Sequence, residues 1–214
     1  MDGATLQARI YSGYAKAALR IGQNAAQYRA ASASDPLNAA NLLRTIPASF
    51  NAEDMTYSKP NKYGHPTWYG LFDGSLTQVG DYLTGAFGTY FIAAQQQALP
   101  ILCVQCNRVA TVTRASENAA AGLQSYNADV AAQETTLMTA WPCSILQGTK
   151  GEKNPTDLPG DTRSPWVAVL MPAWPGVILR TSDILTDDIG NRYIISSAEL
   201  TDLGWRMTAA NAQT

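Results

Sequence analysis

Two segments far apart in the chain have the same arrangement of residues. The first reads GDYLTGAFGTYFIAA from residue 80, and the second reads SDILTDDIGNRYIIS from residue 182. Aligned without gaps, they share an aspartate, a turn glycine and an isoleucine, at the pairs Asp81 and Asp183, Gly88 and Gly190, and Ile92 and Ile194. The aspartate can accept hydrogen bonds from backbone amides, and the glycine supplies the positive φ of a tight turn. Each segment is therefore predicted to be a β-hairpin, with a shared fold-determining role for these residues.

Two further blocks occur in the same order in both halves of the chain. TIPASF resembles AWPCSI, and PTWYGLF resembles SPWVAVL, so that Pro47 lies opposite Pro142 and Trp68 opposite Trp166. Blocks repeated in one order are typical of an internal repeat, although two unrelated β segments are the alternative. Each copy has the length of a small barrel or sandwich.

The chain of 214 residues is predicted to be mainly β (α+β), with two tandem small β-barrel or sandwich modules and an N-terminal helix. The expected divisions are a helical docking segment at 1–40, a first β module at 41–114, an Ala-rich connector at 115–134 and a second β module at 135–214. The run ILCVQCNRVATVTR reads as one strand. Its alternation predicts one core-facing set, namely Leu102, Val104, Cys106, Ala110 and Val112.

Apolar residues recur at helical spacing between residues 4 and 21, and Gly22 suits the end of such a helix. The candidate interface residues on it are Leu6, Ile10, Tyr14 and Ile21. The stripe is narrow and rich in alanine, so a partner could approach closely. It either packs on the chain's own core or docks on another subunit.

Charged residues make up only 15% of the chain, and the net charge is −2. So low a charge density indicates either a surface covered by other subunits of a permanent assembly or an exposed surface rich in uncharged Ala, Thr and Ser. Tight nucleic-acid binding requires a basic patch, and no Lys/Arg cluster occurs, although DNA could still pass without specific binding. We expect no membrane segment, no signal peptide and synthesis in a reducing cytoplasm, since three cysteines form no even disulfide set.

Few residues suggest chemistry. The single histidine, His65, lies in a Gly/Pro loop, and no local nucleophile, P-loop or zinc-protease motif occurs. Cys103 and Cys106 form one C-x-x-C, which Cys143 and His65 could complete to a zinc set. Positions i and i+3 of a strand face opposite sides, so small core thiols are the preferred interpretation over zinc or a redox pair.

The remaining candidates are acidic and aromatic. Asp187 and Asp188 could hold Ca²⁺ or share acid–base work, but their place beside Gly190 favours turn chemistry. Trp174, in PAWPG, would make a contact if exposed, and the other tryptophans read as core or interface anchors. We expect no catalytic residue, no cofactor and no metal.

With these segments in view, the chain resembles structural proteins of tailed bacteriophages and prophages. The likeness lies in GDYLTGAFGTYFIAAQQQALPILCVQCNR and SDILTDDIGNRYIISSAELTDLGWRMTA. The pattern resembles neck and tail components, namely head-closure, adaptor and tail-completion proteins. The resemblance implies small β-barrels with extensions, assembled as rings on the portal axis and without an active site. Two copies and an N-terminal helix depart from the single-barrel head-closure pattern.

We therefore expect a non-enzymatic virion component, made in the host bacterial cytoplasm and placed in the portal-proximal neck or short tail. It would form a homo-oligomeric head–tail connector or adaptor ring, contact the portal or other neck and tail proteins, and let DNA pass. The loops GEKNPTDLPGD and PAWPG would make contacts. The alternatives are a fibre-anchoring tail protein, a head decoration protein, and more remotely a carbohydrate-binding module or a cell-wall hydrolase using Asp or Glu pairs.

Overall fold

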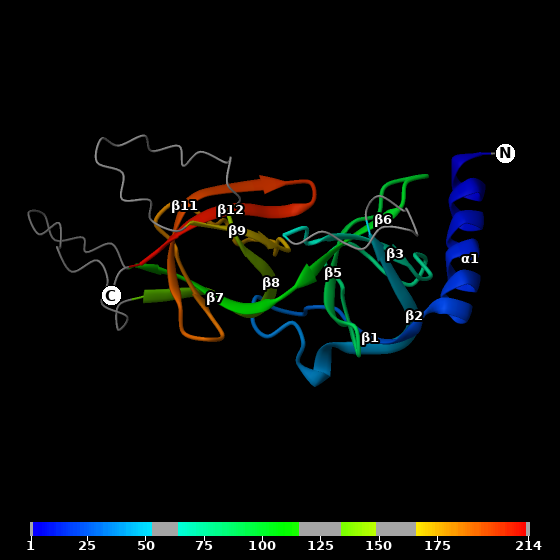
Figure 1. Cartoon of the computed structure of the whole chain (residues 1–214), viewed down its shortest axis with the longest axis horizontal. Helices are drawn as coiled ribbons and strands as arrows, with labels where there is room; N and C mark the ends of the chain where they lie inside the picture. The colour runs from blue at the N-terminus through cyan, green and yellow to red at the C-terminus, as the bar shows by residue number, and fades with distance from the viewer. Residues whose placement is uncertain (1, 53–63, 116–133, 149–165, 213–214) are drawn as a thin grey trace, which may run out of the picture.

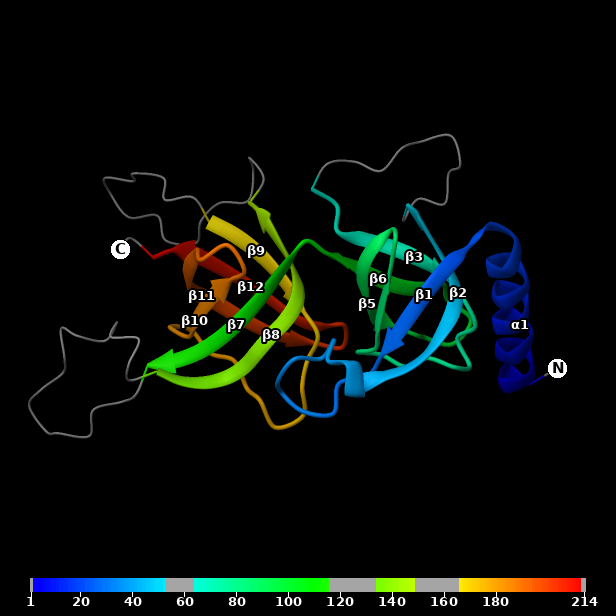
Figure 2. The same cartoon turned by 90° about the horizontal axis from the view of Figure 1, so that it is seen from below.

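The computed structural model describes residues 2–52, 64–115, 134–148 and 166–212, which form two six-stranded β-barrels and one long helix (Figure 1). The helix, the first barrel and the second barrel follow one another along the long axis, with the two termini at opposite ends (Figure 2). The predicted fold class is confirmed: the protein is mainly β, with two β modules behind an N-terminal helix.

The helix and the strands of the first barrel are α1 (Gly3–Ile21), β1 (Gln23–Tyr28), β2 (Leu42–Ala52), β3 (Thr67–Leu71), β4 (Tyr82–Gly85), β5 (Gly88–Ala94) and β6 (Ile101–Cys106), with the short 3₁₀ helix η1 (Ala39–Asn41) before β2. The strands of the second barrel are β7 (Arg108–Ala115), β8 (Glu134–Gln147), β9 (Trp166–Met171), β10 (Ile184–Asp187), β11 (Arg192–Thr201) and β12 (Gly204–Asn211).

The two barrels have the same strand order. The first closes in the order β1-β2-β3-β6-β5-β4, and the second in the order β7-β8-β9-β12-β11-β10, so each strand corresponds to the strand six places later. Every pairing is antiparallel. Closure gives each strand a neighbour on both sides, although β11 extends beyond β10 at one end.

An irregularity of the ladders is repeated as well. A bulge lies between Ile92 and Ala94 where β5 pairs with β6, and another between Ile195 and Ser197 where β11 pairs with β12. Bulges re-aim a strand at a defined place, so the matching positions mean that the two barrels bend at the same point of their fifth strands.

The bulges show that the ungapped alignment slips by one residue after the turn. Ile92 and Ile195 each donate a backbone hydrogen bond of 2.9 Å to the carbonyl of Asp81 and Asp183, respectively. Both isoleucines are 1% exposed, whereas Ile194 is 44% exposed. The pairing of Ile92 with Ile194 is therefore wrong.

The cause is a longer turn in the second hairpin. In the first hairpin Gly85 pairs directly with Gly88, whose φ is +100°. In the second, the backbone N–H of Asp187 reaches the carbonyl of Asn191, and Gly190, with a φ of +87°, lies inside this wider turn. Both glycines adopt the left-handed backbone that the sequence predicts, but they are not strict equivalents.

The other repeated blocks can be placed by strand register. Ala25 pairs with Ile46 and Ala110 pairs with Trp141, so the prolines that follow, Pro47 and Pro142, are equivalent as expected. The tryptophan pair is displaced by one residue. Ser49 pairs with Leu71 in the first barrel, and Ser144 pairs with Leu170 in the second. Leu71 and Leu170 are therefore equivalent, so Trp166 is equivalent to Thr67 and not to Trp68.

The expected divisions of the chain differ from the observed ones. Strand β1 lies inside the segment 1–40 and belongs to the first barrel, and β7 is the first strand of the second barrel. Residues 116–133, in the expected connector, lie outside the described residues; they join β7 to β8 within the second barrel. Asn107 alone separates the barrels, and its side chain makes two hydrogen bonds of 2.8 Å with the backbone of Ile145.

Residues of both barrels form one apolar cluster, here called the shared core, and a second cluster fills the first barrel. Val104, Leu102 and Cys106 pack in a cluster with the interior of the second barrel, while Ile101 and Cys103 face the interior of the first. Strand β6 is thus buried on both faces, and the expected single core-facing set describes only one of them. The reason is that the second barrel covers the face that would otherwise meet solvent.

A buried tyrosine joins the barrels by a hydrogen bond. The hydroxyl of Tyr82 donates to the carbonyl of Pro142 at 2.8 Å, and its ring centroid lies 6.2 Å from that of Trp141. The indole N–H of Trp141 donates to the carbonyl of Ala33 at 2.7 Å, so the segment between β1 and β2 also contacts the second barrel. Burial raises the pKa of Tyr82 well above its usual value.

Replacing Tyr82 by phenylalanine should therefore weaken the joint between the barrels. The change Tyr82→Phe keeps the ring but removes the donor to the Pro142 carbonyl, and we expect a loss of about 1–2 kcal/mol in the free energy of unfolding. Urea unfolding followed by Trp fluorescence measures it. Tyr69→Phe is the matched control, since the hydroxyl of Tyr69 has no hydrogen-bond partner among the described residues. Equal stability of the two variants would contradict the assignment.

Candidate interaction surface

One face of α1 is fixed to the first barrel. Tyr11 and Tyr14 pack against the core cluster of that barrel, and Ala18 is 1% exposed. The side chain of Gln7 accepts a hydrogen bond of 2.6 Å from the backbone N–H of Ala98, in the β5–β6 loop. Asp2 caps the helix by accepting from the N–H of Thr5 at 2.8 Å. The helix is thus held near both ends of its inner face.

The opposite face of α1 is basic. Arg9, Lys16 and Arg20 are all exposed, and their spacings of seven and eleven residues are close to whole turns of a helix with about 3.6 residues per turn. Ala18 lies nine residues after Arg9, half a turn away from this stripe. No acidic residue occurs in α1, which therefore carries +3 in a chain whose net charge is −2, leaving −5 for the rest.

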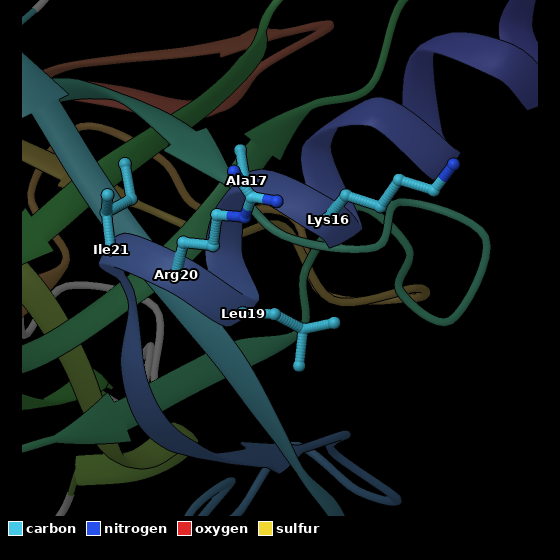
Figure 3. A pocket seen from close by; sticks show the side chains of 5 residues that line it. All are labelled: Lys16, Ala17, Leu19, Arg20 and Ile21. Atoms are coloured by element: carbon cyan, nitrogen blue, oxygen red, sulfur yellow. The ribbon is translucent and has the colours of Figure 1, made fainter.

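Apolar side chains lie beside these cations. Leu19 is 72% exposed and Ile21 55%, and Leu19 is the most exposed large apolar side chain among the described residues. Together with Lys16, Ala17 and Arg20 they line an open groove of about 540 Å³ (Figure 3). Exposed apolar side chains grouped with cations on one helix are typical of a surface that meets a partner. We call these five residues the α1 groove.

The interface residues predicted on the helix fall on different faces. Leu6 and Ile21 are exposed, at 44% and 55%, so they are free for contact. Ile10 is half-buried, and Tyr14 is half-buried against the helix's own barrel, where burial raises its pKa. Sequence reasoning missed Leu19, although the cation spacing around it was a signal that could have found it.

Trp174 occupies a half-buried position on the second barrel. Its ring centroid lies 5.9 Å from that of Trp141, and it packs against the shared core. Part of the ring therefore serves its own barrel, and a contact with a partner through Trp174 stays a prediction. The loop GEKNPTDLPGD lies outside the described residues.

The repeated aspartates each bind an arginine that the sequence reasoning did not identify. Arg29, just after β1, donates from Nε and Nη2 to the two carboxylate oxygens of Asp81, at 2.7 and 2.8 Å. Arg114, near the end of β7, donates in the same way to Asp183, at 2.7 and 2.9 Å. The hydrogen bond to Asp81 raises the pKa of the Arg29 guanidinium, against a smaller opposing effect of burial.

Backbone amides complete both carboxylate sites. Gln78 N–H donates to Asp81 at 3.0 Å, and Arg180 N–H donates to Asp183 at 2.7 Å, each from three residues earlier in the chain. The side chains of Asp81 and Asp183 are almost fully buried. Paired, charge-assisted hydrogen bonds of this kind fix geometry strongly. These aspartates therefore hold the entry to β4 and β10 in place.

Removing either charge should destabilise its barrel. Asp81→Asn and Asp183→Asn each turn a carboxylate that faces a guanidinium into an amide, and we expect each to cost about 3 kcal/mol, the lower end for a broken buried ion pair, because both arginines are partly exposed. Arg44→Gln, at an exposed position of β2, is the control and should change stability by less than about 0.5 kcal/mol. Thermal and urea unfolding measure all three. A pair of variants as stable as the control would refute this role.

Asp187 serves the turn in which it lies. Its carboxylate accepts from the N–H of Ile189 at 3.1 Å, from the N–H of Asn191 at 2.8 Å and from the hydroxyl of Tyr193 at 3.2 Å. Asp188 is exposed, and its carboxylate accepts from the N–H of Val109 at 3.3 Å. This is the geometry of a capped turn, the interpretation that the sequence favoured.

The three cysteines are free thiols within or beside the cores. Cys103 and Cys143 are fully buried, Cys106 is half-buried, and burial raises the pKa of all three. His65 lies in an exposed loop. Among the described residues, no group of three His, Cys, Asp or Glu side chains is placed to hold a metal ion. None of the described helices is long and apolar enough to cross a membrane.

The buried thiols predict a loss of stability at alkaline pH. Their raised pKa values in the folded state mean that, above about pH 9, the unfolded chain releases protons that the folded chain keeps, so the free energy of unfolding falls as the pH rises. Each such thiol contributes about 1.4 kcal/mol per pH unit in that range. Unfolding free energies between pH 7 and 10.5 measure the slope. Cys103→Ala should reduce it by one such increment, and an unchanged slope would contradict the burial of a protonated thiol.

Comparison with known proteins gives no match at the level of families, curated sequences or folds. No family model matches the chain, and neither a curated protein nor a solved structure is significantly similar to it.

Proposed function

We propose that this chain is a structural subunit of a tailed-phage virion, in the portal-proximal neck or short tail. It acts there as part of a head–tail connector or adaptor ring through which DNA passes, and it has no catalytic role. The sequence resemblance to neck and tail components suggests this position, and the α1 groove is the single structural observation that supports it best.

A subunit of a permanent ring needs rigid walls and an accessible docking element. One apolar cluster contains residues of both barrels and packs them together, so the body of the subunit is stiff along its long axis. The helix α1 lies at one end of that axis (Figures 1 and 2), and its Leu19 and Ile21 are exposed. Its partners in this proposal are the portal, other neck or tail proteins, or neighbouring subunits.

The experiment is quantitative mass spectrometry of purified phage particles, which counts copies of the chain per particle. A subunit of a single ring should be present on the order of ten times per particle, because a closed cyclic assembly holds a small and fixed number of copies. Absence from purified particles would reject the proposal. A count in the hundreds would favour a head decoration protein instead. Cryo-electron microscopy of the same particles, with the chain labelled, would distinguish a neck position from a fibre-anchoring one.

A further inference from the structure

We propose that the α1 groove of one subunit receives the end of the β11–β12 hairpin of a second copy of the same chain. This inference rests on the proposed function in one respect, because both place α1 at an interface between subunits. It goes further by naming the partner surface and the chemistry that joins the two.

The hairpin end, residues 199–203, is complementary to the groove in charge and in apolar character. Glu199 and Asp202 are exposed and give it −2, while the groove contributes the cations Lys16 and Arg20. Leu200 is 56% exposed and Leu203 38%, matching the exposed Leu19 and Ile21 of the groove. Beyond this end the hairpin has two basic residues, Arg206, opposite Glu199 on β12, and Arg192, at the start of β11.

The hairpin end is preformed. The hydroxyl of Thr201 accepts from the N–H of Leu203 at 3.1 Å and donates to the carbonyl of Gly204 at 2.8 Å. Gly204 has a φ of +109°, which a side-chain-bearing residue would adopt only with strain. A rigid end loses little conformational entropy on binding, so its exposed side chains can contribute directly to affinity.

This hairpin is where the second barrel departs from the first. Strands β5 and β6 are joined by residues 95–100, whereas β11 and β12 stay paired through Thr201 and Gly204 and extend past the bulge that both barrels share. Strand β10 pairs with β11 only as far as Ile194. The outer part of β11 therefore has β12 as its one strand neighbour among the described residues. At its end Asp202 accepts a hydrogen bond of 3.5 Å from the side chain of Gln96, while Leu200 and Leu203 are exposed.

A subunit cannot fill its own groove in this way. The side chain of Gln96, in the β5–β6 loop, lies 3.5 Å from the Asp202 carboxylate, and Ala98 of that loop contacts Gln7 near the start of α1. The groove begins at Lys16, nine residues or roughly 13 Å further along the helix. In both views the first barrel separates the hairpin end from the last turns of α1 (Figures 1 and 2). The contact must join two copies.

Such a contact uses two different surfaces and is therefore head-to-tail. Head-to-tail interfaces close into rings when the rotation between subunits allows it and otherwise extend as filaments. Because charges dominate the recognition, the contact should weaken as salt screens it, with a Debye length of about 8 Å near physiological ionic strength.

Charge reversal on the full-length protein tests the inference. Lys16→Glu with Arg20→Glu makes the groove acidic, and Glu199→Lys with Asp202→Lys makes the hairpin end basic. Sedimentation velocity over a concentration series at low salt should show that the wild-type chain self-associates. Each double variant should raise the dissociation constant by about tenfold or more, since like charges then face one another. Arg44→Glu, an exposed reversal on β2, is the matched control and should leave it unchanged.

Recovery of assembly is the decisive result. The variant with all four reversals restores opposite charges and should assemble within about threefold of the wild type. An equimolar mixture of the two double variants should also assemble, because each groove then meets a complementary hairpin end. Circular dichroism confirms that each variant folds, and Lys16→Gln with Arg20→Gln replaces any reversal that does not.

Several results would overturn the inference. These are a wild-type chain that stays monomeric, double variants that assemble as the wild type does, or failure of both the fourfold variant and the mixture to recover. Binding of wild-type monomers to vesicles containing phosphatidylglycerol, lost in the groove variant, would identify a membrane surface as the partner instead. The particle count tests the proposed function separately. A chain present in virions but without charge-swap recovery loses this inference alone, and one with recovery but absent from virions loses the proposed function alone.

Discussion

The buried carboxylate at the entry to the fourth strand of each barrel is the interaction on which closure depends. A charge inside a protein is tolerated only when hydrogen bonds replace the water it loses. Asp81 receives them from Gln27, Arg29 and the Gln78 backbone, and its own carbonyl accepts from Ile92. One residue thus ties the first strand to the turn before β4 and to β5. Asp183 binds Arg114, Arg180 and Ile195 in the corresponding way.

Closure in turn limits how the molecule can meet a partner. An open sheet can add a strand of another chain at its edge, whereas a closed barrel has such an edge only where a strand extends beyond its neighbour, as the outer part of β11 extends beyond β10. Any specific contact of these barrels must therefore come from side-chain surfaces or from elements that project beyond them. In the described part of the chain, the helix α1 projects from the first barrel and the extended β11–β12 hairpin from the second. Neither α1 nor the extended end of the hairpin has a counterpart among the described residues of the other barrel.

Sequence reasoning recovered what is local and missed what is distant. The hairpins were predictable because aspartate, glycine and alternating side chains lie within one short segment. Arg29 and Arg114 were not, because 52 and 69 residues separate them from their carboxylates. The boundary between the barrels was hidden because alternation continues through Asn107, so β6 and β7 read as one strand. The slip between Ile194 and Ile195 arose because two adjacent isoleucines fit either register.

The sequence also predicted the interface residues of α1 only in part. Helical spacing predicted an amphipathic α1 but could not say which side of its apolar stripe the barrel covers. Tyr14 proved to be committed to the barrel, and Ile21 did not. The charges of the helix were readable in advance, since a helix with three cations and no acid is already asymmetric. Their meaning required the structure, which places them opposite Ala18 and on the free face.

That free face has an energetic cost to the isolated subunit. Lys16 and Arg20 are four residues apart, and like charges at this spacing destabilise a helix by about 0.2–0.5 kcal/mol. The helix dipole partly offsets the unfavourable effect of the Arg20 charge, because Arg20 lies in the last turn. Lys16 lies outside that turn and gains no such compensation. Leu19, between them, adds exposed apolar surface. An acidic, leucine-bearing partner would relieve both costs at once, since it supplies counter-charges and removes the leucine from water. The α1 groove thus has the composition of a surface that is more favourable covered than free.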